Sequence, residues 1–203
     1  MKIFLHNDDI PSDIISSSSI AIDTETMGLN ITRDRLCLIQ LSFGDGNAHL
    51  VKFSNNYQAN NLKKILTNDN IKKIFHFARF DLAVLYHYLN INFQNIYCTK
   101  IASKLTRTYT DAHSLKNLCE ELLGIEISKK YQSSDWGVEK LSDKQMEYAS
   151  NDVIYLHKIM EKLDQMIIRN NREEILKKCF DFLPTRAMLD LAGFSNVDIF
   201  SHS

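Results

Sequence analysis

Residues 20–29, IAIDTETMGL, place two acidic side chains at the end of an apolar run. A period of two is typical of a β-strand, so Ala21, Asp23 and Glu25 would share one face of it. Burying a carboxylate is costly unless a positive charge or a hydrogen-bonding partner accompanies it. A fold that accepts this strand in its core must therefore supply something that neutralises both acids.

Four further segments have the composition of strands. Residues 35–53 predict a hairpin with two strands around the turn Gly44-Asp45-Gly46. Residues 71–77 and 95–99 predict one strand each. With residues 19–26 these segments make five strands, and helices are expected between them at 61–68 and 79–90.

The second half of the chain, from Lys100 onward, has helical periodicity almost throughout. Residues 114–124 end in Gly124, a plausible C-cap, and residues 141–168 open with Ser142 and Gln145 at the spacing of a capping box. A further helix or pair of helices is expected at about 172–193. We therefore expect one α/β domain spanning residues 1–203, with a helical C-terminal extension from about residue 165.

The composition excludes several classes of protein. The chain has 203 residues and is 44% hydrophobic. Its net charge of −1 gives no overall positive field that would attract a long polyanion, but this sum does not exclude a local basic cleft. Its four cysteines lack metal-site spacing, which favours free thiols in a reducing compartment. No signal-peptide core and no apolar run of membrane-spanning length is present. A cytoplasmic protein is expected.

Two more acids lie where they can join Asp23 and Glu25. Asp81 follows the strand 71–77 at the start of a helix, and Asp152 lies mid-helix with Tyr148 one turn before it. Each has an ordinary explanation, since Asp81 would suit a helix N-terminus and Asp152 a solvated surface. Together, four carboxylates predict a two-metal site, in which divalent cations about 3.5–4 Å apart clamp a phosphodiester.

The motifs DTETMGL, HFARFDLAVL and YASNDVIYL resemble the three exonuclease motifs of the DEDD superfamily of 3′–5′ exonucleases. The resemblance implies a ribonuclease-H-like fold, a mixed five-stranded sheet flanked by helices. Tyr148 lies four residues before Asp152, which is the spacing of the tyrosine branch. The segments 98–106 and 133–156 resemble ribonuclease D. The short length, together with the segments 98–116, 132–136 and 182–203, resembles the nanoRNase C family.

This resemblance implies roles for individual residues. Asp23, Glu25, Asp81 and Asp152 would bind two Mg²⁺ or Mn²⁺ ions, which would activate the attacking water. Tyr148 would orient that water, because a phenol with an unperturbed pKa of about 10 is a poor general base. The expected substrates are short RNAs, chiefly dinucleotides, cleaved to 5′-mononucleotides, and the expected assembly is a homo-octamer.

Substrate contacts are predicted for nine residues: Thr24, Thr26, Gly28, Leu29, His76, Phe80, Lys100, Lys104 and Arg107. Leu29 would act as a wedge against the bases or, alternatively, as a core leucine. Lys100, Lys104 and Arg107 would form a basic stripe for a 5′ phosphate or a plain solvated helix face. His76 would touch the 3′-terminal ribose or belong to the core.

Four further residues draw attention without a firm role. Trp136 would either stack on a base or pack in the core, and packing is favoured for a lone tryptophan. His113, Arg186 and His202 are candidates for the cleft or for a subunit interface.

Three functional hypotheses remain open at this point. The first is an oligoribonuclease specialised for dinucleotides, and the second is a broader ribonuclease-D-like exonuclease acting on longer RNA 3′ ends or on DNA. The third is a catalytically inactive RNA-binding scaffold, against which the complete set of acids and Tyr148 argues.

Overall fold

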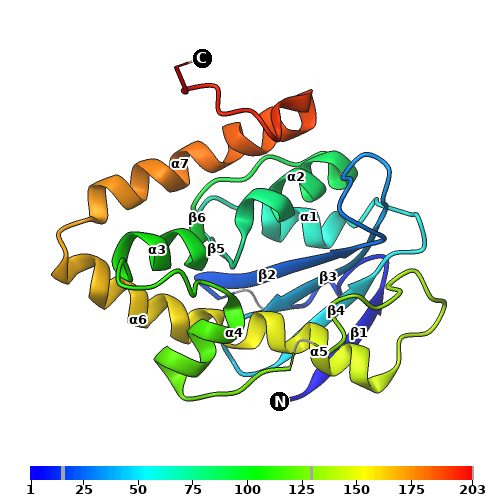
Figure 1. Cartoon of the computed structure of the whole chain (residues 1–203). Helices are drawn as coiled ribbons and strands as arrows, with labels where there is room; N and C mark the ends of the chain where they lie inside the picture. Colours follow the sequence, from blue (N-terminus) through cyan, green and yellow to red (C-terminus); the bar gives the residue numbers. More distant parts are fainter. Residues whose placement is uncertain (15–16, 129, 203) are drawn as a thin grey trace.

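A computed structural model describes residues 1–14, 17–128 and 130–202; Ser203, the last residue of the segment 182–203, lies outside them. The strands form one mixed sheet in the order β1-β4-β3-β2-β5-β6 (Figure 1). Central strand β2 is antiparallel to β3 and parallel to β5. The strands are β1 (Ile3–Asn7), β2 (Ser19–Thr26), β3 (Leu36–Ser42), β4 (Ala48–Lys52), β5 (Lys72–Phe75) and β6 (Ile96–Cys98).

The sheet has six strands, where the sequence predicted five. The additional strand is β1, which pairs in parallel with β4 at one edge of the sheet. Its five residues are all exposed or half-buried, so no buried apolar alternation marks it in the sequence. The five predicted strands are present, and the predicted hairpin joins β3 to β4 through Gly44 and Gly46, whose φ angles are +83° and +79°.

Helices cover both faces of the sheet (Figure 1). Helices α1 and α2 lie on one face and α5 and α6 on the other, while α7 packs over α2 and β6. The bounds are α1 (Asn60–Leu66), α2 (Ala78–Leu89), α3 (Thr99–Thr106), α4 (Leu115–Leu118), α5 (Asp143–Ile154), α6 (Leu156–Arg169) and α7 (Glu173–Leu189), with π-helical turns η1 (Cys119–Leu123) and η2 (Asp190–Phe194).

The predicted helix ends are confirmed, but one predicted helix is divided. Ser142 and Gln145 form both hydrogen bonds of a capping box at the start of α5, and Gly124 ends η1 with φ +68°. The expected helix at 141–168 breaks at Tyr155, where α5 ends and α6 begins. Because of this break α5 packs on β2, β3 and β4 while α6 packs on α3. None of the helices in the described ranges combines the length and apolar character that crossing a bilayer requires.

Candidate active site

Three of the predicted acids meet at the end of β2. Asp23 and Glu25 lie two residues apart on β2, and Asp152 reaches them from α5. One carboxylate oxygen of each lies within 4.8 Å of the others. Asp81, in the first turn of α2 and only 3% exposed, lines the same pocket. A strand, a strand–helix junction and a helix thus bring all four acids around one cavity.

Neighbouring polar side chains orient these carboxylates. The Thr24 hydroxyl donates a hydrogen bond to Asp81 Oδ1 at 2.7 Å, which links β2 to α2. Gln40 lies opposite Asp23 on β3, and its side-chain amide donates to Asp23 Oδ2 at 3.4 Å. Gln40 was not predicted, although a fully buried glutamine in the apolar run LCLIQLS was a signal that could have identified it.

The acids are electrostatically unfavourable in the absence of a cation. Burial, followed by repulsion from Asp152 and Asp81, raises the pKa of Glu25 to about 9. Burial also raises the pKa values of Asp81 and Asp152 to about 7, and the pKa of Asp23 rises through burial and through all three neighbouring acids. Oxygen ligands that repel one another in this way form the donor set that hard divalent cations neutralise.

Tyr148 lies one helical turn before Asp152 and lines the same pocket. Burial and the nearby acids, Asp152 first, raise the pKa of its phenol, so the hydroxyl stays protonated and acts as a hydrogen-bond donor. Trp136 is 2% exposed and its ring lies 6.0 Å from the Tyr148 ring. This position agrees with the packing alternative for Trp136 and gives Tyr148 a rigid support.

The pocket around the acids has a volume of about 390 Å³ and is lined by both acidic and basic side chains. Besides the acids and Tyr148, the side chains of Lys100, Lys116 and Gln132 contribute polar groups to its lining. His76 and Phe80 also line this pocket, and His76 Nδ1 lies 2.9 Å from Thr99 Oγ1. Lys100 Nζ lies 4.6 Å from the centre of the Phe77 ring, at the boundary of the pocket.

The turn after β2 displays Leu29 to solvent. Leu29 is 86% exposed, which excludes the core-leucine alternative. A β-bulge between Glu25 and Thr26 bends the chain into the turn, and the Thr26 hydroxyl donates to the Gly28 carbonyl. An ideal Cβ at Gly28 would lie 2.4 Å from Asp34 Oδ2, so a side chain there would displace the Asp34 carboxylate from its hydrogen bonds with Asn30 and Arg33. The hydroxyls of Thr24 and Thr26 therefore have partners within the chain, and the structure gives both residues a role in shaping the site.

The predicted basic stripe does not exist in the expected form. Lys100 lines the pocket, whereas Lys104 is exposed on a neighbouring groove. Helix α3 ends at Thr106, and Arg107 turns inward, is 0% exposed and forms an ion pair with Glu121. The assignment of Arg107 to substrate binding is therefore wrong for this chain, because the guanidinium stabilises the loop after α3.

Two of the residues without a predicted role have partners inside the chain. His113 is buried, and its Nδ1 lies 2.8 Å from Ser103 Oγ. Arg186 pairs with Asp190. His202 is exposed near the C-terminus and has no assigned partner among the described residues.

The Glu121→Gln variant is expected to lose about 2 kcal/mol of unfolding free energy, because it leaves the buried Arg107 guanidinium without its counter-charge. This value lies below the usual cost for a fully buried pair, since Glu121 itself is 41% exposed. Urea unfolding measures the difference. Glu120→Gln removes the same charge from the adjacent, exposed position and should change stability by less than about 0.5 kcal/mol. Equal stability of the two variants would contradict a structural role for Arg107.

Comparison with known proteins places this geometry in a family. A family described as 3′-5′ exonuclease matches residues 6–168. The structure of Brucella melitensis NrnC is 52% identical and superposes with a TM-score of 0.96, covering 100% of this chain and 99% of that one. A structure of the same protein bound to pGG is 52% identical, with a TM-score of 0.96. A structure with bound Mg²⁺ is 51% identical, with a TM-score of 0.95. Both matches cover 100% of each chain.

Curated relatives match over a smaller part of their length. DNA polymerase I of Aquifex aeolicus is 34% identical over 87% of this chain, and ribonuclease D of Bartonella henselae is 27% identical over 85% of it. The chain spans 30% and 43% of those two proteins, respectively. The NrnC match, by contrast, extends over both proteins from end to end. The chain therefore belongs to the 3′–5′ exonucleases, and within them to the NrnC-like, ribonuclease-D-like members of the DEDD superfamily.

Proposed function

We propose that this exonuclease degrades short oligoribonucleotides, chiefly RNA dinucleotides, from the 3′ end to 5′-mononucleotides. The observation that carries the proposal is a pocket of only about 390 Å³ whose lining includes all four acids, Tyr148 and Lys100. A dinucleotide with its phosphodiester at the acids and its 5′ phosphate at Lys100 would span it. The end-to-end similarity to NrnC, which was solved with bound pGG, supports this substrate class.

The acidic cluster would hold two divalent cations, Mg²⁺ or Mn²⁺. Asp23, Glu25, Asp81 and Asp152 supply only oxygen ligands, and their raised pKa values indicate a site built for positive charge. The NrnC structure with bound Mg²⁺ supports the choice of metal. When bound, such ions supply Lewis acidity at the phosphoryl oxygens and a nucleophile at neutral pH.

The remaining polar residues would position the reacting groups. Thr24 and Gln40 fix the carboxylates, and the protonated Tyr148 phenol would donate a hydrogen bond that orients the attacking water. Leu29 and Phe80 would contact the bases, and His76 the ribose. The net charge of −1 is adequate for a substrate with one or two phosphates, because little affinity for it arises from counterion release.

The Tyr148→Phe variant is expected to lower kcat about 100-fold with little change in KM, because one positioned donor disappears while the pocket keeps its shape. The pH dependence of kcat should keep its form, since the phenol is protonated throughout the working range. Tyr155→Phe, at the end of the same helix, is the matched control and should behave like the unmodified protein. A pH–rate limb that disappears in Tyr148→Phe would instead identify the phenol as a general base.

A length series tests the substrate class. The 5′-labelled RNAs of two, three, five and seven residues, and the matching DNAs, would be digested with Mg²⁺ or Mn²⁺. Rapid loss of the RNA dinucleotide with slow attack on longer chains is the expected result. Equal rates at every length would favour the broader ribonuclease-D-like activity, to which the Bartonella relative points. Absence of cleavage under all conditions would favour an inactive scaffold.

We also propose that residues 1–203 act as one domain in a cytoplasmic homo-oligomer, an octamer by family resemblance. All four cysteines are free, and Cys37, Cys98 and Cys119 are buried, which suits a reducing compartment. Exposed apolar side chains on α7 and after it, including Phe182, Met188 and Phe200, would be covered by subunit contacts. Light scattering at several concentrations measures the assembly, and a monomer at every concentration would overturn it.

A further inference from the structure

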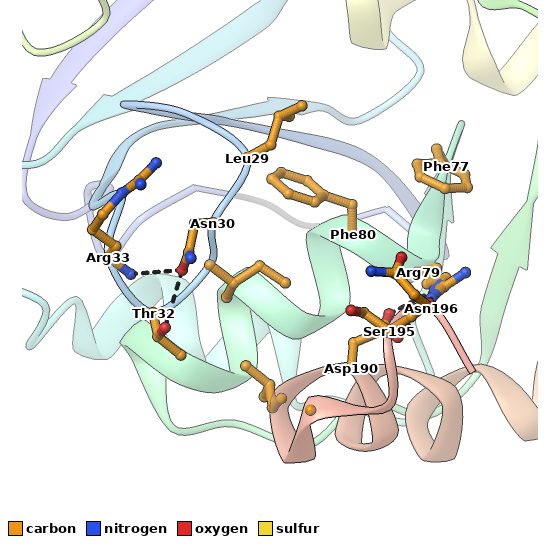
Figure 2. Close-up of a pocket in the computed structure, with 13 residues that line it drawn as sticks. Leu29, Asn30, Thr32, Arg33, Phe77, Arg79, Phe80, Asp190, Ser195 and Asn196 are labelled. Atoms are coloured by element: carbon orange, nitrogen blue, oxygen red, sulfur yellow. Dashed lines mark hydrogen bonds and ion pairs between the residues drawn. The ribbon is translucent and has the colours of Figure 1, made fainter. Parts of the chain in front are cut away.

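A second cavity, of about 750 Å³, adjoins the catalytic pocket and shares Phe77 and Phe80 with it (Figure 2). The turn that carries Leu29 lies on one side of this cavity. The C-terminal segment, defined here as residues 190–196, lies on the other. The shared phenylalanines mean that one ligand can reach both spaces at once.

The wall nearest the catalytic pocket is apolar and accessible. Leu29 is 86% exposed and Phe77 is 47% exposed, and Phe80 lines the same cavity (Figure 2). Exposed aromatic and aliphatic side chains of this kind offer flat surfaces on which a nucleobase stacks. The two apolar faces therefore favour a planar ring.

The charges around the cavity argue against a phosphate. Arg33 is bound to Asp34, with Nε 2.6 Å from Oδ1, and Arg79 is bound to Asp190, with Nε 2.6 Å from Oδ2. Both arginines that line the cavity thus already face a carboxylate. A neutral ligand with hydrogen-bonding edges fits this surface better than an anion does.

The C-terminal segment is fastened to the helix that carries Asp81. The Asp190 carboxylate accepts hydrogen bonds from Arg79 of α2 and from Arg186 of α7, whose Nη2 lies 2.8 Å from Asp190 Oδ1. The same guanidinium groups donate to backbone carbonyls of the segment, Arg79 to Ser195 at 2.6 Å and Arg186 to Phe194 at 2.8 Å. This clamp holds the segment at a fixed distance from Phe80.

The side-chain amide of Asn196, the residue after the clamped carbonyl of Ser195, forms part of the cavity wall. Asn196 is exposed and lines the cavity, and among the described residues its side chain has no hydrogen-bond partner. An asparagine amide offers both donors and an acceptor, which is the pattern needed to pair with a base edge.

We propose that this cavity receives one nucleobase of the oligonucleotide, that Asn196 contacts its edge as a specificity-determining residue, and that Asp190 positions Asn196. This inference rests on the proposed function, because it assumes that a short oligonucleotide occupies the adjacent catalytic pocket. It assigns the C-terminal segment, which lies beyond the matched residues 6–168 of the exonuclease family, to the substrate site.

The test compares three substrates: an intact dinucleotide and two dinucleotides that lack the base at either the 5′ or the 3′ residue. Asn196→Ala should raise KM for the intact dinucleotide up to about tenfold with kcat unchanged, as expected for one lost hydrogen bond. One of the two abasic substrates lacks the base that would occupy the cavity. For that substrate Asn196→Ala should leave KM unchanged, because Asn196 has no base to contact. Asp190→Asn should show the same selectivity, and Asp190→Glu should restore part of the affinity. Asn70→Ala, an exposed asparagine elsewhere, is the control.

The outcomes separate this inference from the proposed function. Equal KM changes on all three substrates, or none on the intact one, would overturn the base pocket while leaving the dinucleotidase activity intact. Failure of the unmodified protein to cleave any dinucleotide would overturn both. Because Asn196 is exposed, its variant keeps the test decisive even where Asp190→Asn fails to fold.

Discussion

The Asp23→Asn variant is expected to lose at least about 1,000-fold in kcat and yet to melt at a higher temperature than the unmodified protein in EDTA. Loss of a ligand removes several kcal/mol of transition-state stabilisation, and each 1.36 kcal/mol is a factor of ten in rate. Stability should increase because the partial burial of Asp23 and the neighbouring carboxylates of Asp81, Asp152 and Glu25 together raise its pKa. Each kcal/mol of relieved repulsion corresponds to about 2–4 °C in Tm.

The matched control for this variant is Glu147→Gln on α5. Glu147 is exposed and loses the same charge, so both its activity and its Tm should stay close to the original values. Activity assays with Mg²⁺ and thermal melts in EDTA measure the two effects separately. A variant that is both inactive and less stable would show that Asp23 has a structural role that outweighs the repulsion.

The second large effect is expected from metal removal and pH. EDTA should abolish hydrolysis, and Mg²⁺ or Mn²⁺ should restore it. In EDTA the Tm should fall as the pH rises from about 5 to about 9, and the slope follows from the signs of the pKa shifts. Glu25 has a folded-state pKa of about 9, and Asp81 and Asp152 of about 7, all raised above their ordinary values. The folded protein therefore holds protons that the unfolded chain has lost, and this stabilisation disappears as those groups ionise.

Divalent cations should reverse this dependence. Metal binding replaces the protons on the acids, so the Tm increase caused by Mg²⁺ should grow with pH over the same range. Thermal melts at several pH values, with EDTA or with Mg²⁺, measure the difference directly. Asp23→Asn should show a shallower slope in both series. A Tm difference between the Mg²⁺ and EDTA series that is independent of pH would contradict a metal site built from these carboxylates.

The elements that the sequence predicted are those with local signals. The period of two placed Asp23 and Glu25 on one face of β2, and the capping box placed the start of α5, which in turn fixed Tyr148 and Asp152 one turn apart. Both patterns arise within a few residues of the chain and are dominated by backbone geometry. The convergence of the acids was predicted from the four carboxylates taken together and then from the resemblance to known exonuclease motifs.

The features that the sequence did not predict depend on contacts between distant residues. Arg107 had the spacing of a helix face, but its position is decided by Glu121, fourteen residues further along the chain. The bond between Arg79 and Asp190 joins residues 111 positions apart. Strand β1 is specified by its pairing with β4 rather than by its own pattern. Tertiary contacts override local propensity at each of these places.

The six consecutive residues from His76 to Asp81 contribute to every part of the site. Within them are Asp81, one of the four acids that line the pocket, the aromatic boundary between the two cavities and the arginine that holds the C-terminal segment. Removing or adding one residue would rotate all that follows in α2 by about 100°, since an α-helix has 3.6 residues per turn. We therefore expect insertions to be tolerated in the turn between β3 and β4 but not in this hexapeptide, because its length fixes the direction of every side chain that follows in α2.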